Sequence, residues 1–309
     1  MIASRDERTT DPHTAAHGQQ RSTPGHQAKD TADHAGSDRP LHVVIVGSLL
    51  TKLIRRTVQT WPAFDRVHRS AERRLPPYGG DREPSPTINA MRDELRADLL
   101  EVGRLLVSMA EAARTAMGHA TEALLTADRE ICETVIARDV EINDLQRQVD
   151  QLVYDTLARQ APVATDLRLV ITGIQISLDI ERMGDLAMHV AKTALRRYPA
   201  PAVPPELRGV ITSMGEVADR MAGKVGLVLT TQNATLGAEL ESDDDAMDDL
   251  QRQLFNVLLH REWPHGAEAA IDGALLGRFY ERYADHAVNA GRQVVYLVTG
   301  ETSEPPGVA

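Results

Sequence analysis

Apolar residues recur every three or four positions along most of the chain after residue 90. From Met91 to Leu124 this spacing is kept over about eight turns, which predicts a long helix with one apolar face (Leu95, Leu99, Val102, Leu106, Met109, Ala113, Ala116, Ala120 and Leu124). A second stretch with the same spacing runs from about Asp128 to Arg159. Pro162 follows it, and because proline is tolerated only in the first turn of a helix, it predicts a break and the start of a third helix.

The same pattern occurs again after a proline-rich break at 199–205. The sequence DLQRQ is found at 144–148 and at 249–253, an offset of 105 residues. ERMGDLAMHV, from Glu181, is matched by ERYADHAVNA, from Glu281, at an offset of 100. We therefore expect an all-α protein with six long helices, arranged as two three-helix repeats (91–198 and 206–300) in an antiparallel bundle, with 301–309 as a flexible tail.

Residues 1–90 show neither a helical nor an alternating period. They hold 13 Lys and Arg, 10 Asp and Glu, six of the 11 His and eight of the 16 Pro, a composition that buries too little apolar surface to offset the entropy of ordering. This predicts a disordered extension. Its apolar run at 43–50 is shorter than the roughly 20 residues that a membrane span needs, and basic residues follow it, unlike in a secretory signal. A second hypothesis is that translation begins at Met91, which a peptide map of the native protein would test.

The charge of the chain is unevenly distributed. The formal charge of −11 combines +3 in residues 1–90 with −14 in the remainder, which holds 21 Lys and Arg against 35 Asp and Glu. The acidic helical part opposes a nucleic-acid role, because contacts to phosphates need a basic surface. The single cysteine, Cys132, lies on an apolar stripe, which predicts a buried small residue, and a lone cysteine fits a reducing compartment such as the cytoplasm.

Acidic residues four positions apart are the main candidate chemistry. Such residues share one helix face with Cβ atoms roughly 6 Å apart. If the second and third helices of each repeat pack side by side, four oxygen-bearing side chains meet in each repeat (Asp139, Asn143, Glu181 and Asp185 in the first; Asp244, Asp248, Glu281 and Asp285 in the second). Oxygen clusters suit cations such as Mg, Mn, Ca or Fe, so we predict a metal site in each repeat, with His189 as a candidate nitrogen ligand.

Other interpretations of these residues stay open. Acidic pairs are common on solvated helix faces, Arg182 and Arg282 are placed to neutralise their acidic neighbours, and His189 also suits a packing role. The sequence lacks a phosphate-binding loop, HExxH, GxSxG and the ExxH pairs of di-iron bundles. A metal-binding helical protein or a carboxylate metalloenzyme is therefore the alternative to a protein without enzymatic activity.

Several segments together resemble the PhoU family of regulators of bacterial phosphate uptake. They are MRDELRADL, ALLTADREICETVIARDVEINDLQ, ARQAPVATDLR, ERMGD, ERYADHAVN and VVYLVTGE, and they cover about Met91 to Glu301. The resemblance implies two three-helix repeats with pseudo-twofold symmetry in a cytoplasmic protein that is commonly dimeric.

The resemblance also implies a function and a set of ligands. Family members are negative regulators of the phosphate regulon, placed between the ATPase subunit of the phosphate-specific ABC transporter and a membrane histidine kinase that senses phosphate. Contact with the membrane is then expected only through these partners. The family's E/DxxxD motifs correspond to the acidic pairs above, with the first-repeat pair ending in Asn143, and imply bound metal ions such as Mg, Mn, Fe or Zn.

Overall fold

A computed structural model describes residues 86–301 of the chain, and these residues fold into six helices. The helices are α3 (Pro86–Thr126), α4 (Arg129–Gln160), α5 (Thr165–Arg197), α6 (Pro205–Thr231), α7 (Ala234–Leu258) and α8 (Gly266–Thr299). The six predicted helices are confirmed, although α3 begins at Pro86, before the expected Met91. The predictions for residues 1–85 and 302–309, including the disordered extension and the flexible tail, lie outside the described residues.

Local signals account for most of the helix ends. The side chain of Asp128 accepts a hydrogen bond from the backbone N–H of Ile131 and caps α4, and Asn233 caps α7 in the same way. Pro205 is the first residue of α6, where its missing N–H leaves no hydrogen bond unmade. Gly300 ends α8 with φ of 77°, a left-handed conformation that glycine adopts at little cost. These ends fix the lengths of the helices, and with them which residues of neighbouring helices lie at the same height along the bundle.

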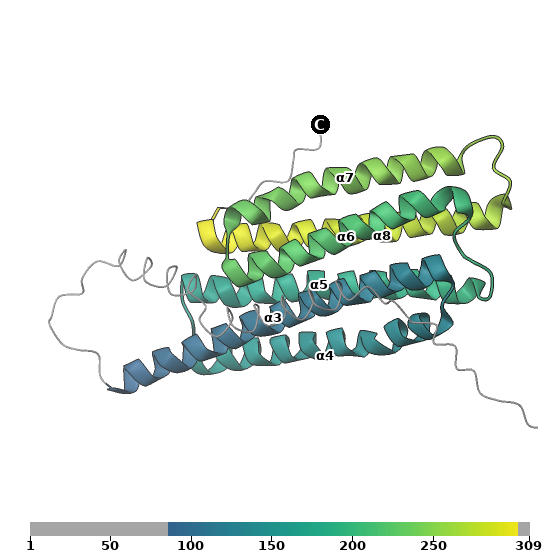
Figure 1. Cartoon of the computed structure of the whole chain (residues 1–309). Helices are drawn as coiled ribbons and strands as arrows, with labels where there is room; N and C mark the ends of the chain where they lie inside the picture. The colour runs from purple at the N-terminus through teal and green to yellow at the C-terminus, as the bar shows by residue number, and fades with distance from the viewer. Residues whose placement is uncertain (1–85, 302–309) are drawn as a thin grey trace, which may run out of the picture. The chain divides into compact units, whose positions relative to one another are not determined.

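The helices pack as the two predicted repeats (Figure 1). Helices α3, α4 and α5 pack against one another, as do α6, α7 and α8, and successive helices run antiparallel. The repeats join through α3 with α6 and α5 with α8, which leaves α4 and α7 on the outer sides. Within residues 86–301, no helix is long and apolar enough to cross a membrane.

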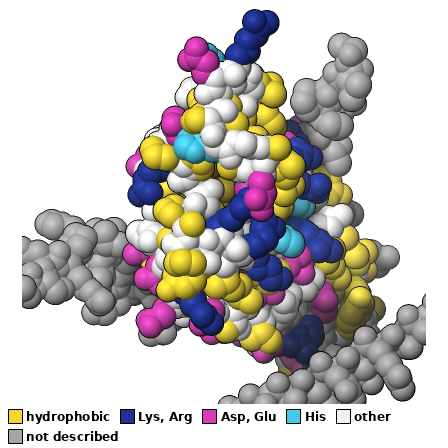
Figure 2. Space-filling view, turned by 90° about the vertical axis from the view of Figure 1, so that its right-hand side faces the viewer, with side chains coloured by type: hydrophobic (Ala, Val, Ile, Leu, Met, Phe, Trp, Pro, Cys, Tyr) yellow, Lys and Arg dark blue, Asp and Glu magenta, His cyan; other side chains and the backbone are white. Residues whose placement is uncertain are grey.

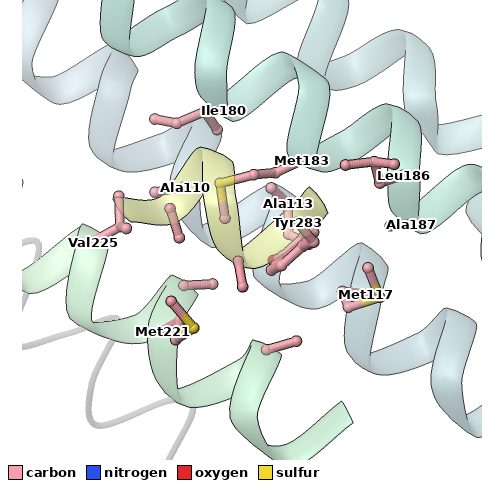
Figure 3. Packing of buried hydrophobic residues seen from close by; sticks show 14 of the residues in the cluster. Ala110, Ala113, Met117, Ile180, Met183, Leu186, Ala187, Met221, Val225 and Tyr283 are labelled. Carbon is pink, nitrogen blue, oxygen red and sulfur yellow. The ribbon is translucent and has the colours of Figure 1, made fainter. Parts of the chain in front are cut away.

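Equivalent residues of the two repeats meet at the centre of the interface between them. Arg114 of α3 and Asp219 of α6 are 105 positions apart, and the guanidinium donates to both carboxylate oxygens at 2.8 and 2.9 Å. Tyr283 of α8 lies among core side chains of the other helices, and its hydroxyl donates to the Ala113 carbonyl oxygen at 3.2 Å (Figure 3). The duplication seen in the sequence is thus a pseudo-twofold arrangement in the structure.

Ion pairs also join the repeats at the end of the bundle where α5 ends and α8 begins. Arg196 and Arg197 of α5 both pair with Asp272 of α8, whose side chain is 5% exposed. Within the second repeat, His265 at the start of α8 pairs with Glu206 of α6, with 2.7 Å between nitrogen and oxygen. Lys and Arg side chains gather around acidic ones on this end of the molecule (Figure 2). These charged contacts hold the end of α5 against the start of α8.

Candidate functional site

The predicted site residues lie where α4 meets α5 and where α7 meets α8. In the first repeat the close approach depends on Gly184, which stands between Glu181 and Asp185. A Cβ atom at Gly184 would lie 2.7 Å from Cδ1 of Ile142, so with Ile142 in this position glycine lets α4 pack at this distance. The prediction that the second and third helices of each repeat lie side by side is confirmed.

The first carboxylate cluster consists of Asp139 and Asn143 of α4 with Glu181 and Asp185 of α5. Asn143 donates a hydrogen bond to Asp139 at 3.1 Å along the same helix. Burial raises the pKa of Asp139, and the negative charge of Asp185 across the helix pair raises it further. Burial and Asp185 likewise raise the pKa of Glu181. The four side chains therefore form one electrostatically coupled patch.

Arg182 partly neutralises the first carboxylate cluster. It donates to Asp185 at 3.0 Å, and its Nε lies 3.6 Å from a carboxylate oxygen of Glu181. His189 is exposed, and its ring stacks on Phe279 of α8 with 5.3 Å between ring centroids. The geometry thus favours the ion-pairing interpretation of Arg182 and the packing interpretation of His189.

The second carboxylate cluster consists of Asp244 and Asp248 of α7 with Glu281 and Asp285 of α8. Burial, followed by the charges of Asp285 and Asp248, raises the pKa of Asp244 to about 6. Burial and Asp285 also raise the pKa of Glu281. Oδ1 of Asp244 and Oε2 of Glu281 are buried and have no hydrogen-bond partner in the described part of the chain. This cluster holds more uncompensated negative charge than the first.

The cation that pairs with Glu281 is Arg278, one turn before it on α8. The sequence had suggested Arg282 for this role, which is wrong for the described residues. Arg182 and Arg282 occupy equivalent positions, but in the second repeat Arg278 stands on the other side of the carboxylate. The two clusters are consequently neutralised in different ways.

The donor set of the second carboxylate cluster fits a cation better than that of the first. Its two unpartnered buried oxygens are available as ligands, whereas in the first cluster Asn143 and Arg182 already contact the carboxylates. With the side chains as they stand in residues 86–301, no three His, Cys, Asp or Glu converge closely enough to hold a metal ion. Side-chain rotation would be needed to form such a site. The structure brings the eight predicted residues into two clusters, and metal binding stays a prediction.

One pair beside the first carboxylate cluster was not foreseen from the sequence. Nδ1 of His286 on α8 lies 2.9 Å from a carboxylate oxygen of Asp179 on α5, and both side chains are largely buried. His286 also lowers the pKa of Glu181, against the stronger effect of burial. The two residues are 107 positions apart, and no spacing within either helix signals their contact.

Cys132 is 1% exposed, which confirms the prediction of a buried small residue. Burial raises the pKa of its thiol, so the protonated form is favoured at neutral pH. A thiol in this state is a poor nucleophile. Cys132 therefore belongs to the core and not to the site.

Exposed apolar residues lie on the same side of α5 as the first carboxylate cluster. Leu167, Ile171 and Leu178 are 39%, 46% and 46% exposed, and Asp185 follows Leu167 by 18 residues, about five full turns. On α8 the residues Ile271 and Leu275 are exposed as well. We call these five residues the apolar patches. Exposed apolar side chains that gather on one surface often mark a site of protein–protein contact.

Comparison with known proteins finds the same repeated architecture in a protein family. A family model described as "PhoU domain" matches residues 106–194 and 211–294, one match in each repeat. A Mycobacterium tuberculosis protein named phosphate-specific transport system accessory protein PhoU homolog 2 is 45% identical over 210 residues, which cover 68% of this chain and 99% of the relative. A Mycobacterium leprae protein, PhoU homolog 1, is 43% identical and covers 69% of this chain and 96% of its own length.

A solved structure agrees with these matches. The crystal structure of PhoU from Pseudomonas aeruginosa is 28% identical and superposes with a TM-score of 0.57, covering 69% of this chain and 99% of that one. PhoU from Streptococcus pneumoniae has the same fold, with a TM-score of 0.58. The two family matches, the near-complete alignment of the mycobacterial relatives and the repeated three-helix architecture lead to one conclusion: this chain belongs to the PhoU family.

Proposed function

We propose that this protein is a cytoplasmic accessory protein of phosphate transport that represses phosphate uptake and phosphate-regulon signalling when phosphate is plentiful. In this role it contacts the ATPase subunit of a phosphate-specific ABC transporter and a phosphate-sensing histidine kinase. The observation that carries the proposal is the 45% identity with a phosphate-transport accessory protein over 99% of that protein's length. Since nearly the whole relative is represented, the proposal does not depend on one shared motif.

The exposed side of α5 and α8 is the surface that best suits such contacts. It carries the apolar patches, which supply surface that a partner can bury. The carboxylates further along the same two helices supply charge that can orient the partner. We expect the partner to present basic or metal-bridged groups to the carboxylates and apolar groups to the patches. We further propose a homodimer, as in many family members, and membrane contact only through the partner proteins.

We also propose that the carboxylate clusters bind divalent or iron-type cations such as Mg, Mn, Fe or Zn. A bound cation would supply positive charge that offsets the repulsion among the carboxylates. In the second cluster Asp244 and Glu281 offer their unpartnered oxygens, and Asp248 and Asp285 complete the donor set. In the first cluster Arg182 would have to turn away from Asp185 before a cation takes its place.

The alternative function is a metal-binding protein or a carboxylate metalloenzyme. The unpartnered oxygens of the second cluster favour cation binding, but a hydrolase or oxidase also needs a base or nucleophile beside a substrate cleft. Burial and the repulsion among neighbouring carboxylates account for the raised pKa values in both clusters. We therefore infer a regulatory protein without a reaction of its own.

A deletion strain tests the proposed function. The gene and any paralogue are removed from the native host, and a reporter for phosphate-scavenging genes is measured in medium rich in phosphate. The proposal expects the reporter to be switched on and the wild-type gene to restore repression. Normal repression in the deletion strain would contradict it.

Surface variants then connect the phenotype to the exposed side of α5 and α8. Replacing Ile171 and Leu275 by Ser removes apolar area from the patches without opening a cavity, because both are more than 40% exposed. We expect loss of repression with unchanged thermal stability. Leu227→Ser on α6, also 49% exposed but away from the patches, is the matched control and should repress normally.

A further inference from the structure

The two carboxylate clusters occupy equivalent positions in the two repeats, but they differ in charge. The stretch of α4 at 138–143, RDVEIN, holds one basic and two acidic residues. The aligned stretch of α7 at 243–248, DDDAMD, holds four acidic residues and no basic one. Asn143 stands at the position that Asp248 occupies in the second repeat, so the first cluster has three carboxylates and the second has four.

In the first cluster a side chain of the protein supplies positive charge to the carboxylates. Arg182 donates to Asp185 at 3.0 Å, and its Nε lies 3.6 Å from a carboxylate oxygen of Glu181. A guanidinium that contacts both acids of α5 provides the charge that a bound cation would provide. On α4, Asn143 donates to Asp139 at 3.1 Å. Each of the three carboxylates therefore already has a partner within the chain.

Two further basic residues of α5 act on the first cluster. Burial raises the pKa of Asp139, and the positive charges of Lys192 and His189 oppose this effect. Both residues lie on α5 beyond the carboxylates, at 189 and 192. The first repeat thus surrounds its acids with basic side chains.

The second repeat lacks this basic surrounding. The residues aligned with His189 and Lys192 are Asn289, which carries no charge, and Arg292. Arg292 donates to Glu241 of α7 at 2.8 Å, and Glu241 is not a member of the cluster. Within residues 86–301, the pair of Arg278 with Glu281 is the one ion pair that the four carboxylates make.

The oxygens of the two clusters differ accordingly. Oδ1 of Asp244 and Oε2 of Glu281 are buried without a hydrogen-bond partner, whereas no oxygen of the first cluster is in this state in the described part of the chain. Burial, followed by the charges of Asp285 and Asp248, raises the pKa of Asp244 to about 6. A buried acceptor without a donor costs free energy, so a cation gains more by binding to the second cluster.

We propose that the two carboxylate clusters bind a divalent cation unequally, with the second cluster filled first and Arg182 acting as an internal cation that closes the first. This inference rests on the cation binding proposed above and adds that the duplicated sites have diverged. A change in cation supply then acts first on α7 and α8 and leaves α4 and α5 as they are.

Binding of Mn²⁺ to the full chain tests the proposal. Electron paramagnetic resonance of the free ion gives the number of sites and their dissociation constants. We expect one tight site per chain and a second that is at least about tenfold weaker, because affinity for a hard cation follows the charge of its ligands. Asp244→Asn with Glu281→Gln should remove the tight site. Asp139→Asn with Glu181→Gln should leave the tight site in place.

Arg182→Gln tests the role of the internal cation. The side chain of Arg182 is 59% exposed, so its replacement opens no cavity, and circular dichroism verifies that the helices remain. We expect the weaker site to bind Mn²⁺ about threefold to tenfold more tightly, and more tightly still when Asn143→Asp is added. Arg282→Gln removes the same charge at the aligned position of α8 and is the matched control, which should leave the weaker site unchanged.

Three results would overturn the inference while leaving cation binding intact. They are two sites of equal affinity in the parent, loss of the tight site in the variant of Asp139 and Glu181, and an equal effect of Arg182→Gln and Arg282→Gln on the weaker site. Absence of bound Mn²⁺ in the parent would overturn the cation proposal and this inference together. The reporter strain tests the regulatory role separately.

Discussion

The close contact between Gly184 and Ile142 allows a quantitative test of how the first carboxylate cluster is held together. In Gly184→Ala the new Cβ would lie 2.7 Å from Cδ1 of Ile142, against 3.4–4 Å for an ordinary contact. Ile142 is 3% exposed, and the atom met is the end of its side chain, which would have to shift to make room. Overpacking of this kind costs about 1–3 kcal/mol, and the better helix propensity of alanine returns about 0.5–1 kcal/mol. These values leave a net loss of about 1 kcal/mol at the middle of their range, which is what we expect.

The second repeat supplies the compensating change. Its residues at the aligned positions are Ala284 and Met247, both fully buried. Because methionine is unbranched and adapts to irregular space, Ile142→Met should relieve the clash. Alone, Ile142→Met is expected to cost less than about 1.5 kcal/mol. The double variant should therefore be more stable than the sum of the two single changes by at least about 1 kcal/mol.

Equilibrium unfolding in urea measures these differences, provided that the slope of the transition stays constant. Gly118→Ala on α3 is the control, because a Cβ there meets nothing within 4 Å and should stabilise by helix propensity alone. If Gly184→Ala is as stable as the parent, or if the single and double changes are additive, the steric reasoning is refuted.

Three further predictions concern charge. In urea titrations, Asp244→Asn should raise the unfolding free energy by about 1–2 kcal/mol at pH 7 and leave it unchanged at pH 4. The reason is that a folded-state pKa of about 6 makes the parent lose stability as the pH rises from about 4 to 6. The exposed control Asp245→Asn should leave the unfolding free energy unchanged at both pH values. Millimolar MnCl2 should raise the melting temperature of the parent more than that of a variant with both Asp244→Asn and Glu281→Gln, and equal shifts would contradict the cation proposal. Arg114→Met should lower stability by about 1 kcal/mol, because it removes two hydrogen bonds from Asp219, whose side chain is 46% exposed and stays partly hydrated; no loss in chemical denaturation would contradict this.

The helices were predictable because their signals are local. The spacing of apolar residues and the breaks at Pro162 and in the proline-rich stretch at 199–205 act within one or two turns, and each appears at the expected place. The start of α3 was placed too late, because the residues before Met91 carry little apolar pattern and proline is tolerated in the first turn of a helix, where Pro86 stands.

The candidate site was predictable only as two sets of helix faces. Four-residue spacing determines that Glu181 and Asp185 share a face whatever the tertiary structure. Which cation pairs with Glu281 was not predictable, because Arg278 and Arg282 are both within one turn of it and the spacing does not distinguish them. The contact of His286 with Asp179 was not predicted either, because the two residues lie on different helices and are 107 positions apart.

The sequence by itself determined six helices, their duplication and the acidic pairs, since each follows from the fixed period of the α-helix and from aligned segments of one chain. Only the tertiary structure decided which carboxylates are desolvated together and which of their oxygens lack a partner. These properties depend on side-chain volumes and charges that meet across helices far apart in the sequence, where a difference of one ångström changes the outcome.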